Sequence, residues 1–168
     1  MAADLSTYKQ QDAAAADRFR QVFRCHPAGV VVLTLDAGRG PVGFTATSLT
    51  SLSLDPPLLS FSISKTSSSW PQLRDADIIV VNFLGANQEA VARRFATSGI
   101  DRFADPTRWH RLPDGDPVLD DVSGWLRGRV ENMISVGDQR IVIGRLEDSW
   151  FSSEASSLVY HDGCYRSL

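Results

Sequence analysis

A hydroxyl-rich stretch over residues 43–57 has the clearest potential for chemistry in this chain. It reads Gly-Phe-Thr-Ala-Thr-Ser-Leu-Thr-Ser-Leu-Ser-Leu-Asp-Pro-Pro, and six of its fifteen residues are Ser or Thr. Small hydroxyl donors beside backbone N–H groups can hold a flat polar ring or a phosphate. Before the terminal Asp55-Pro56-Pro57 turn, the stretch contains no acid, base or metal ligand. It is therefore predicted to be a binding cradle.

A second hydroxyl cluster surrounds Lys65, between Ser64 and Ser69, and leads directly into Trp70-Pro71-Gln72-Leu73. A serine can cap a helix whose first turn contains proline, so the pattern predicts a helix that begins here. The helix dipole, the free N–H groups and the lysine together would favour a phosphate. A polar loop with a helix cap is the alternative interpretation. Considered jointly, the cradle and this cluster could hold the two ends of one flavin nucleotide.

The titratable residues give little support for a metal site or for hydrolysis. None of the three histidines has a second His or Cys at metal-ligand spacing. His26 at a predicted helix end and His110 in a polar loop are interpreted as structural. His161, between two tyrosines near the C-terminus, is compatible with a structural or a functional role. The chain contains neither G-x-S-x-G nor H-E-x-x-H, two common hydrolase motifs.

One motif suggests a dinucleotide site but lacks the required context. Residues 38–43, Gly-Arg-Gly-Pro-Val-Gly, match the G-x-G-x-x-G fingerprint and follow a predicted strand. The fingerprint needs a helix to begin at its end, because the helix N-terminus holds the pyrophosphate. Here Phe-Thr-Ala-Thr-Ser-Leu-Thr follows, and no acid lies about 20 residues further on. The glycines are therefore predicted to form a hairpin turn.

The composition is that of an ordinary soluble globular protein, with 43% hydrophobic and 22% charged residues among 168. This length suits one domain that buries about two-thirds of its surface. We expect residues 1–16 to form a flexible N-terminal tail and residues 17–168 to form the domain. A net charge of −3 with interspersed signs gives no basic footprint for nucleic acid.

The chain is expected to be cytoplasmic. Its first sixteen residues lack the basic start, apolar run and cleavage site of a signal peptide. The longest apolar runs, such as 28–35, are too short to span a bilayer, so no membrane partner is expected. Cys25 and Cys164 lie at opposite ends without ligand-like spacing. Two reduced thiols are expected, and a disulfide is the alternative.

Hydrophobic periodicity predicts three helices and six or seven strands. The helices are expected over 12–24, from residue 70, and over 88–97. The strands are expected over 30–35, 42–51, 58–64, 78–84, 125–136 and 140–150, followed by a closing hairpin around Asp162-Gly163. Gly137-Asp138 suits the turn of the long hairpin, and a polar loop is expected over 101–116. Few helices and several hairpins favour a mainly β fold, an antiparallel barrel with flanking helices.

Several short motifs form a specific set through their order and spacing. They are Pro27-Ala28-Gly29-Val30, Gly43-Phe44-Thr45-Ala46-Thr47-Ser48, residues 51–57, Asn82-Phe83-Leu84, Arg94-Phe95, Arg102-Phe103, Gly137-Asp138, Ile143-Gly144-Arg145, Tyr160 and Gly163-Cys164-Tyr165. From about Phe19 to Leu168 the chain thereby resembles the flavin reductase-like family. That family comprises the small reductase components of two-component flavin-dependent monooxygenases.

This resemblance implies a homodimeric split β-barrel that binds FMN or FAD near the subunit interface. The residues expected along the flavin ring are Pro41, Val42, Gly43, Phe44, Thr45, Thr47 and Ser48. Those expected at the ribityl and phosphate portion are Ser62, Ile63, Ser64, Ser68 and Ser69. Arg94 and Phe95 should complete the flavin site. Leu158, Val159, Tyr160 and His161 are expected to approach the nicotinamide nucleotide.

The late hairpin departs from the family pattern at one position. The family commonly has Gly-Asp-His there, with the histidine near the nicotinamide, whereas Gly137-Asp138 is followed here by Gln139. A glutamine can hydrogen-bond a carboxamide, but it cannot become a cation or transfer a proton at pH 7. Gln139 is therefore expected on the nicotinamide side, with an altered role.

The favoured hypothesis is an NAD(P)H:flavin oxidoreductase. Hydride would pass from NADH or NADPH to the flavin N5, so no catalytic acid or base is expected in the protein. Reduced flavin would then leave for a partner monooxygenase. One alternative is a non-enzymatic flavin-binding or storage module on the same fold. Another is an enzyme that keeps its flavin bound and acts on an organic substrate.

Overall fold

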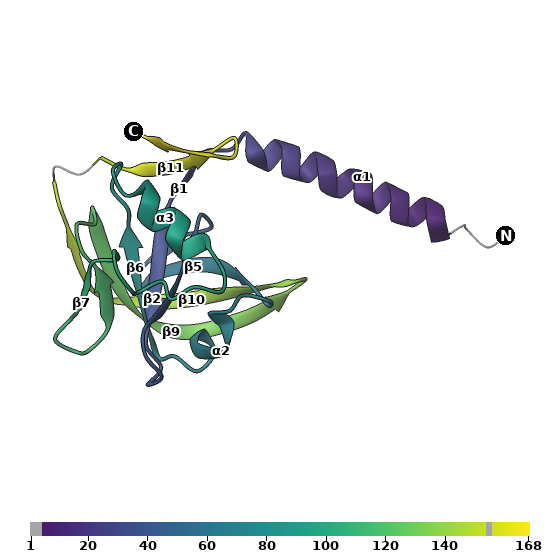
Figure 1. Cartoon of the computed structure of the whole chain (residues 1–168). Coiled ribbons are helices and arrows are strands. Elements are labelled where there is room, and N and C mark those ends of the chain that lie inside the picture. Colours follow the sequence, from purple (N-terminus) through teal and green to yellow (C-terminus); the bar gives the residue numbers. More distant parts are fainter. Residues whose placement is uncertain (1–4, 154–155) are drawn as a thin grey trace.

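The computed structural model describes residues 5–153 and 156–168, with side chains from residue 12 onward in those ranges. Its centre is a seven-stranded antiparallel sheet with the order β3-β2-β6-β9-β10-β5-β4. The strands are β2 (Val31–Leu35), β3 (Val42–Ala46), β4 (Thr50–Leu54), β5 (Pro57–Ser64), β6 (Ile78–Phe83), β9 (Gly124–Val136) and β10 (Gln139–Phe151). Figure 1 shows the long β9–β10 hairpin running crosswise to β2 and β6.

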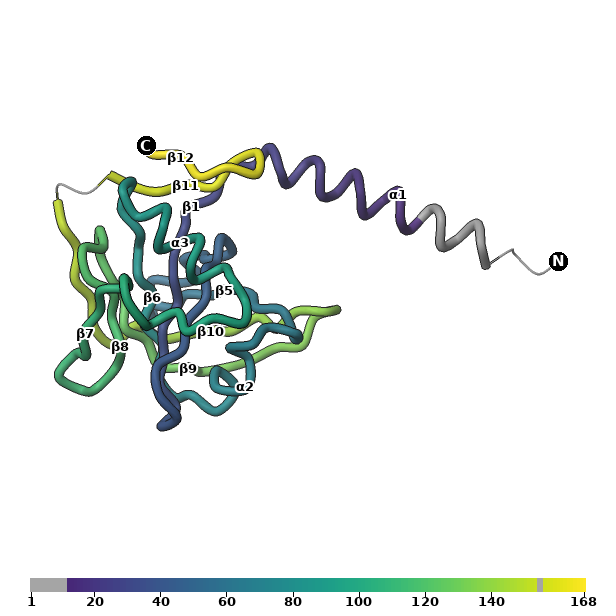
Figure 2. The backbone as a smooth tube through the Cα atoms, viewed as in Figure 1, coloured from purple at the N-terminus to yellow at the C-terminus, as the bar shows by residue number. Residues whose placement is uncertain are grey.

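Smaller elements surround this sheet. β1 (Ala28–Gly29), β11 (Leu158–His161) and β12 (Cys164–Ser167) form a three-stranded sheet, and β7 (Trp109–Arg111) pairs with β8 (Pro117–Leu119). The helices are α1 (Leu5–Arg24), α2 (Trp70–Leu73) and α3 (Glu89–Ala96). Figures 1 and 2 show α1 leading away from the body of the molecule. No helix in the described part of the chain is both long and apolar enough to cross a membrane.

The hydroxyl-rich stretch contains a corner that the sequence analysis missed. A single strand was expected over 42–51, but the chain leaves β3 after Ala46 and enters β4 at Thr50. β3 and β4 are the two outer strands of the seven-stranded sheet. The corner therefore carries the chain from one edge of the sheet to the other, and β3 also contacts β5 across the opening. This arrangement is the expected split barrel, and the mainly β fold class is confirmed.

Strand β5 shows how the sequence builds an inner and an outer face. Leu59, Phe61 and Ile63 are buried in the barrel interior, whereas the intervening serines are half-buried on the other face. Alternation with a period of two is what a strand with one buried face requires. The serines of β5 are thereby directed toward the outside of the barrel, where ligands can reach them.

A buried polar pair connects β8 to the main sheet. The Asn82 side-chain amide donates to the Val32 carbonyl at 2.9 Å and to the Thr34 hydroxyl at 3.0 Å. The Asn82 side-chain oxygen accepts the Leu119 N–H at 2.9 Å, and the Thr34 hydroxyl donates to the Pro117 carbonyl. Because buried polar groups are costly without partners, these bonds fix the position of β8.

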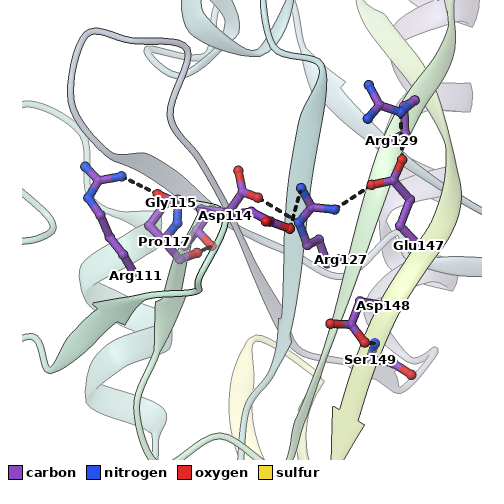
Figure 3. Close-up of polar contacts among 11 residues, drawn as sticks. Arg111, Asp114, Gly115, Pro117, Arg127, Arg129, Glu147, Asp148 and Ser149 are labelled. Atoms are coloured by element: carbon purple, nitrogen blue, oxygen red, sulfur yellow. Dashed lines mark hydrogen bonds and ion pairs between the residues drawn. The ribbon is translucent and has the colours of Figure 1, made fainter.

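Arg127 on β9 anchors the β7–β8 loop to the β9–β10 hairpin (Figure 3). Its side chain is only 12% exposed, and its guanidinium donates to Asp116 at 2.7 Å and to Glu147. Glu147 also accepts from Arg129 at 2.6 Å. The hydrogen bonds from Arg129 and then Arg127 lower the pKa of Glu147, so this carboxylate stays charged at neutral pH.

The hairpin predictions are confirmed. β9 and β10 pair around Gly137, and β11 and β12 pair around Asp162-Gly163, where both residues have positive φ. The glycines at 38 and 40 form a turn and do not open a helix. Their N–H groups donate to the Asp36 carboxylate at 2.9 and 3.1 Å.

Other expectations differ from the structure. The first helix begins at Leu5, so residues 5–16 of the expected tail are helical, while residues 1–4 lie outside the described residues. Residues 101–116 include β7, which was expected to be loop. A serine was expected to cap α2, and Ser69 stands at that position, but its hydroxyl accepts no hydrogen bond from the helix N–H groups and donates to the Gly43 carbonyl at 3.2 Å. This hydrogen bond ties the start of α2 to the edge strand β3.

Gly43 on β3 lies in close contact with both β2 and α3. A Cβ atom at this position would lie 2.7 Å from the Leu33 carbonyl oxygen and 2.8 Å from Cε1 of Phe95. Both atoms belong to fully buried residues, so neither can move aside cheaply. Only glycine fits between β2 and the Phe95 ring.

We predict that Gly43→Ala destabilises the ligand-free protein by about 1–3 kcal/mol, because the added methyl overpacks this contact. Urea unfolding followed by circular dichroism measures the change. Gly29→Ala is the matched control, since a Cβ on that strand glycine would meet nothing within 4 Å. Equal stability of the two variants would contradict the close-contact interpretation.

Candidate functional site

A cavity of about 390 Å³ opens at the corner between β3 and β4. Its walls come from β3, the corner, the outer face of β5, the end of α3 and the loops before α2 and after α3. The lining residues are Phe44, Thr45, Ala46, Thr47, Ser48, Ser62, Ile63, Ser64, Ser67, Ser68, Phe95, Ala96, Ser98 and Arg102. Eight of these fourteen carry hydroxyl groups, and Arg102 is the one charged residue among them.

Two hydroxyl groups hold the cavity walls together. The Ser48 hydroxyl accepts the Ser62 N–H at 2.9 Å and donates to the Ser62 carbonyl at 3.3 Å, which ties the corner to β5. The Thr45 hydroxyl donates to the Ala92 carbonyl at 2.6 Å, which ties β3 to α3. The corner therefore has a fixed shape before any ligand enters, which lowers the entropic cost of binding.

Arg102, in the loop after α3, supplies the positive charge of the cavity. Its Nη1 donates to the Gly43 carbonyl at 2.7 Å and to the Ser69 hydroxyl at 3.2 Å, and its Nη2 lies 3.5 Å from the Ser68 hydroxyl. Burial lowers the pKa of the half-buried guanidinium, although arginine remains a cation at neutral pH. No carboxylate in the described part of the chain forms an ion pair with it.

Arg94 and Phe95, both expected in the flavin site, have different positions. Phe95 is fully buried and lines the cavity. Arg94 is not among the lining residues. Its guanidinium donates to backbone carbonyls of the following loop, including those of Asp101 and Arg102. Arg94 therefore shapes the loop that presents Arg102.

Lys65, the cation of the predicted phosphate cluster, faces another part of the molecule. Its Nζ donates to the Gly137 carbonyl at 2.6 Å, and its backbone N–H donates to the Asp138 carbonyl. Lys65 therefore supports the β9–β10 turn. Sequence reasoning did not include Arg102 among the residues of this cavity, although the Arg102-Phe103 motif within the resemblance was a signal for it.

The expected flavin residues divide between two neighbouring cavities. Pro41, Val42, Gly43 and Ser69 line a smaller cavity of about 300 Å³. Ser68 and Arg102 belong to both cavities, so the guanidinium stands at their boundary. Of the remaining expected residues, all but Arg94 line the larger one.

The residues expected on the nicotinamide side are also spread out. Leu158 and Val159 are buried, so their side chains face the interior. Tyr160 is partly exposed and lines cavities that also include Thr47. His161 pairs with Cys164 in the closing hairpin, and Gln139 pairs with Ser64 in the sheet.

This donor set suits a ligand with a flat polar ring and a phosphate. Hydroxyls and backbone groups can hydrogen-bond the ring, and the uncompensated Arg102 can pair with an anion. Among the described residues no cluster of His, Cys, Asp or Glu could hold a metal ion. The cavity lining also contains no acid–base pair. The arrangement can bind and orient a ligand of this kind.

Two known proteins are similar to this chain over most of its length. An NADH:FMN oxidoreductase of Rhodococcus qingshengii is 48% identical over 156 residues, covering 89% of this chain and 80% of that protein. A flavin-dependent monooxygenase reductase subunit, HsaB of Rhodococcus jostii, is 32% identical and covers 90% and 77% of the two chains.

A solved structure extends the likeness to the fold. The NADH:FAD oxidoreductase SgcE6 of Streptomyces globisporus, in complex with NAD and FAD fragments, superposes with a TM-score of 0.86. It is 29% identical, and the match covers 91% of this chain and 92% of that one. The sequence model described as "Flavin reductase like domain" matches residues 23–168. This chain is therefore a member of the flavin reductase-like domain family.

Proposed function

We propose that this chain is an NAD(P)H:flavin oxidoreductase that reduces FMN or FAD and supplies reduced flavin to a partner monooxygenase. The observation that carries the proposal is the uncompensated cation Arg102 at the edge of a hydroxyl-lined cavity without acid–base groups. The names of the relatives support the same activity. We assign it to the cytoplasm, where reduced nicotinamide nucleotides are available.

The flavin ring is assigned to the corner, with Thr45, Thr47 and Ser48 beside it. The phosphate is assigned to the region of Ser68 and Arg102, where a hydroxyl and a half-buried guanidinium meet. When bound, the flavin supplies the redox chemistry by accepting a hydride from the nicotinamide. The protein's part is to align the two rings and to direct fixed dipoles toward the charge that develops.

The donor nucleotide is assigned to the side of the cavity that holds Tyr160. Gln139 remains assigned to the nicotinamide, where its amide can hydrogen-bond the carboxamide but cannot give up a proton as an imidazolium would. Reduction needs no such proton, because hydride transfer runs directly between the two bound rings.

We predict that the purified protein oxidises NADH continuously when free FMN or FAD is in excess, at about 1 per second or faster. The decrease of NADH absorbance measures the rate. A non-enzymatic flavin-binding or storage module would consume no more NADH than one equivalent of bound flavin. Flavin that stays bound through gel filtration would instead favour an enzyme acting on an organic substrate.

We predict that Arg102→Gln weakens flavin binding about 10- to 100-fold, because a charge-assisted contact to the phosphate is lost. Quenching of flavin fluorescence gives the dissociation constant, and riboflavin, which lacks the phosphate, should bind both proteins alike. Lys65→Gln is the matched control, since Lys65 donates to the Gly137 carbonyl. Unchanged FMN affinity in Arg102→Gln would exclude this phosphate assignment.

A homodimer is part of the proposal. On α1, Phe19, Val22 and Phe23 are 63%, 70% and 57% exposed. Helices in proteins owe most of their stability to packing of an apolar face, so these exposed side chains call for a covering surface. A cavity of about 810 Å³ between α1 and the corner shares Thr47 and Ser48 with the cavity assigned to the flavin, so a second copy seated there would border the flavin.

We predict that light scattering after gel filtration gives the mass of two chains. The double change Phe19→Ser and Phe23→Ser should shift the protein to monomers, because it removes apolar area from the interface. Phe151→Ser, at an exposed site on β10, is the control that should remain dimeric. A monomeric wild-type protein would refute the dimer.

A further inference from the structure

A further cavity, of about 530 Å³, adjoins the cavity assigned to the flavin and shares Thr47 and Ala96 with it. Its remaining walls are Arg93 and Thr97 at the end of α3, and Tyr160 and Tyr165 with Gly163 from the closing hairpin. Among the described residues that line it, Arg93 is the one charged group. Thr47 and Ala96 therefore lie where the two cavities adjoin.

The Arg93 side chain is held over this cavity from two directions. Its guanidinium donates to Glu89 at 2.7 Å, one helical turn earlier. The same guanidinium lies 5.0 Å from the centre of the Tyr165 ring, and the Tyr165 and Tyr160 rings meet edge to face at 5.0 Å. A solvated ion pair on a helix surface would need only the first contact. The stacking on Tyr165 fixes the planar cation, so less side-chain entropy is lost when an anion binds.

We propose that Arg93 binds the diphosphate of the nicotinamide dinucleotide and thereby determines the choice of electron donor. This inference rests on the proposed reductase function. The diphosphate is an anion that lies a few bonds from the nicotinamide, and the Arg93 cavity opens beside the flavin cavity. Arginine is suited to this role because its fork of N–H donors matches phosphate oxygens.

The same geometry favours NADH over NADPH. Glu89 already neutralises part of the Arg93 charge, and the cavity lining offers no second cation among the described residues for an added 2′-phosphate. A further phosphate near Glu89 would be repelled, since like charges raise the free energy of the complex. Arg93 thus attracts the diphosphate that both donors carry, and Glu89 repels the 2′-phosphate that only NADPH carries.

The test compares three donors: NADH, NADPH and 1-benzyl-1,4-dihydronicotinamide, which has neither phosphate nor adenosine. Arg93→Ala should raise KM for NADH about 10-fold, while kcat and KM for FMN change less than about 2-fold. The benzyl donor should react with the variant as with the wild type. Arg74→Ala, which removes an exposed arginine paired with Asp75, is the control that should leave all three donors unaffected.

Glu89→Gln is a second variant, which is expected to improve the use of NADPH. It frees the Arg93 charge, so the ratio of kcat/KM for NADPH to that for NADH should rise severalfold. A merely structural helix pair would make both variants lose activity in parallel. The inference is overturned if Arg93→Ala leaves KM for NADH unchanged, or if it impairs the benzyl donor equally. Failure of the wild-type protein with every donor would instead refute the proposed reductase function.

Discussion

The absence of a side chain at Gly43 lets the Phe95 ring and the Leu33 carbonyl approach more closely than a Cβ atom would tolerate. This contact brings the end of α3 against the edge strand β3. The Gly43 carbonyl then accepts hydrogen bonds from Ser69, before α2, and from Arg102, after α3. One backbone position therefore holds together the sheet edge, the helix and both loops that shape the cavity.

The split in the barrel explains why the site lies where it does. A closed barrel would satisfy the backbone groups of its edge strands, whereas here β3 and β4 remain edges joined by a short corner. The corner is held by Ser48, whose hydroxyl bonds to the backbone of Ser62 in place of a ladder partner. Because side chains alternate between the two faces of β5, its serines point outward next to this corner. The hydroxyls that the fold needs at its open side thus also form a surface for a polar ring.

The sequence predicts those elements whose conformation is set by neighbouring residues, such as turns and periodic strands and helices. The alternation in β5, the turns at Gly137 and Asp162-Gly163 and the helical period of α3 all indicate their structures directly. The corner after Ala46 gave no such signal, because Thr-Ser-Leu-Thr continues a strand-like composition without Gly or Pro. Its position depends on pairing with a distant edge. The hydroxyl-rich cradle could be recognised from the sequence. The Arg102-Phe103 motif was visible as well, but its place beside the cradle was not, since side-chain direction in a loop depends on tertiary contacts.

The arginines around α3 show how those contacts decide chemical roles. Arg94 directs its Nε and Nη2 to backbone carbonyls, so its charge is used to shape the loop. Arg102 uses its Nε and Nη1 in the same way, but its Nη2 has only a long contact with Ser68. Arg93 is balanced by Glu89 and stacked on an aromatic ring. Arg94 lines neither the flavin cavity nor the cavity beside Tyr165, so it is a structural element, whereas Arg102 and Arg93 line these cavities and can receive an anion there. In a reductase whose ligands supply the reactivity, the protein must provide binding and orientation. Arginines held in these different ways do so, and no catalytic acid or base is required.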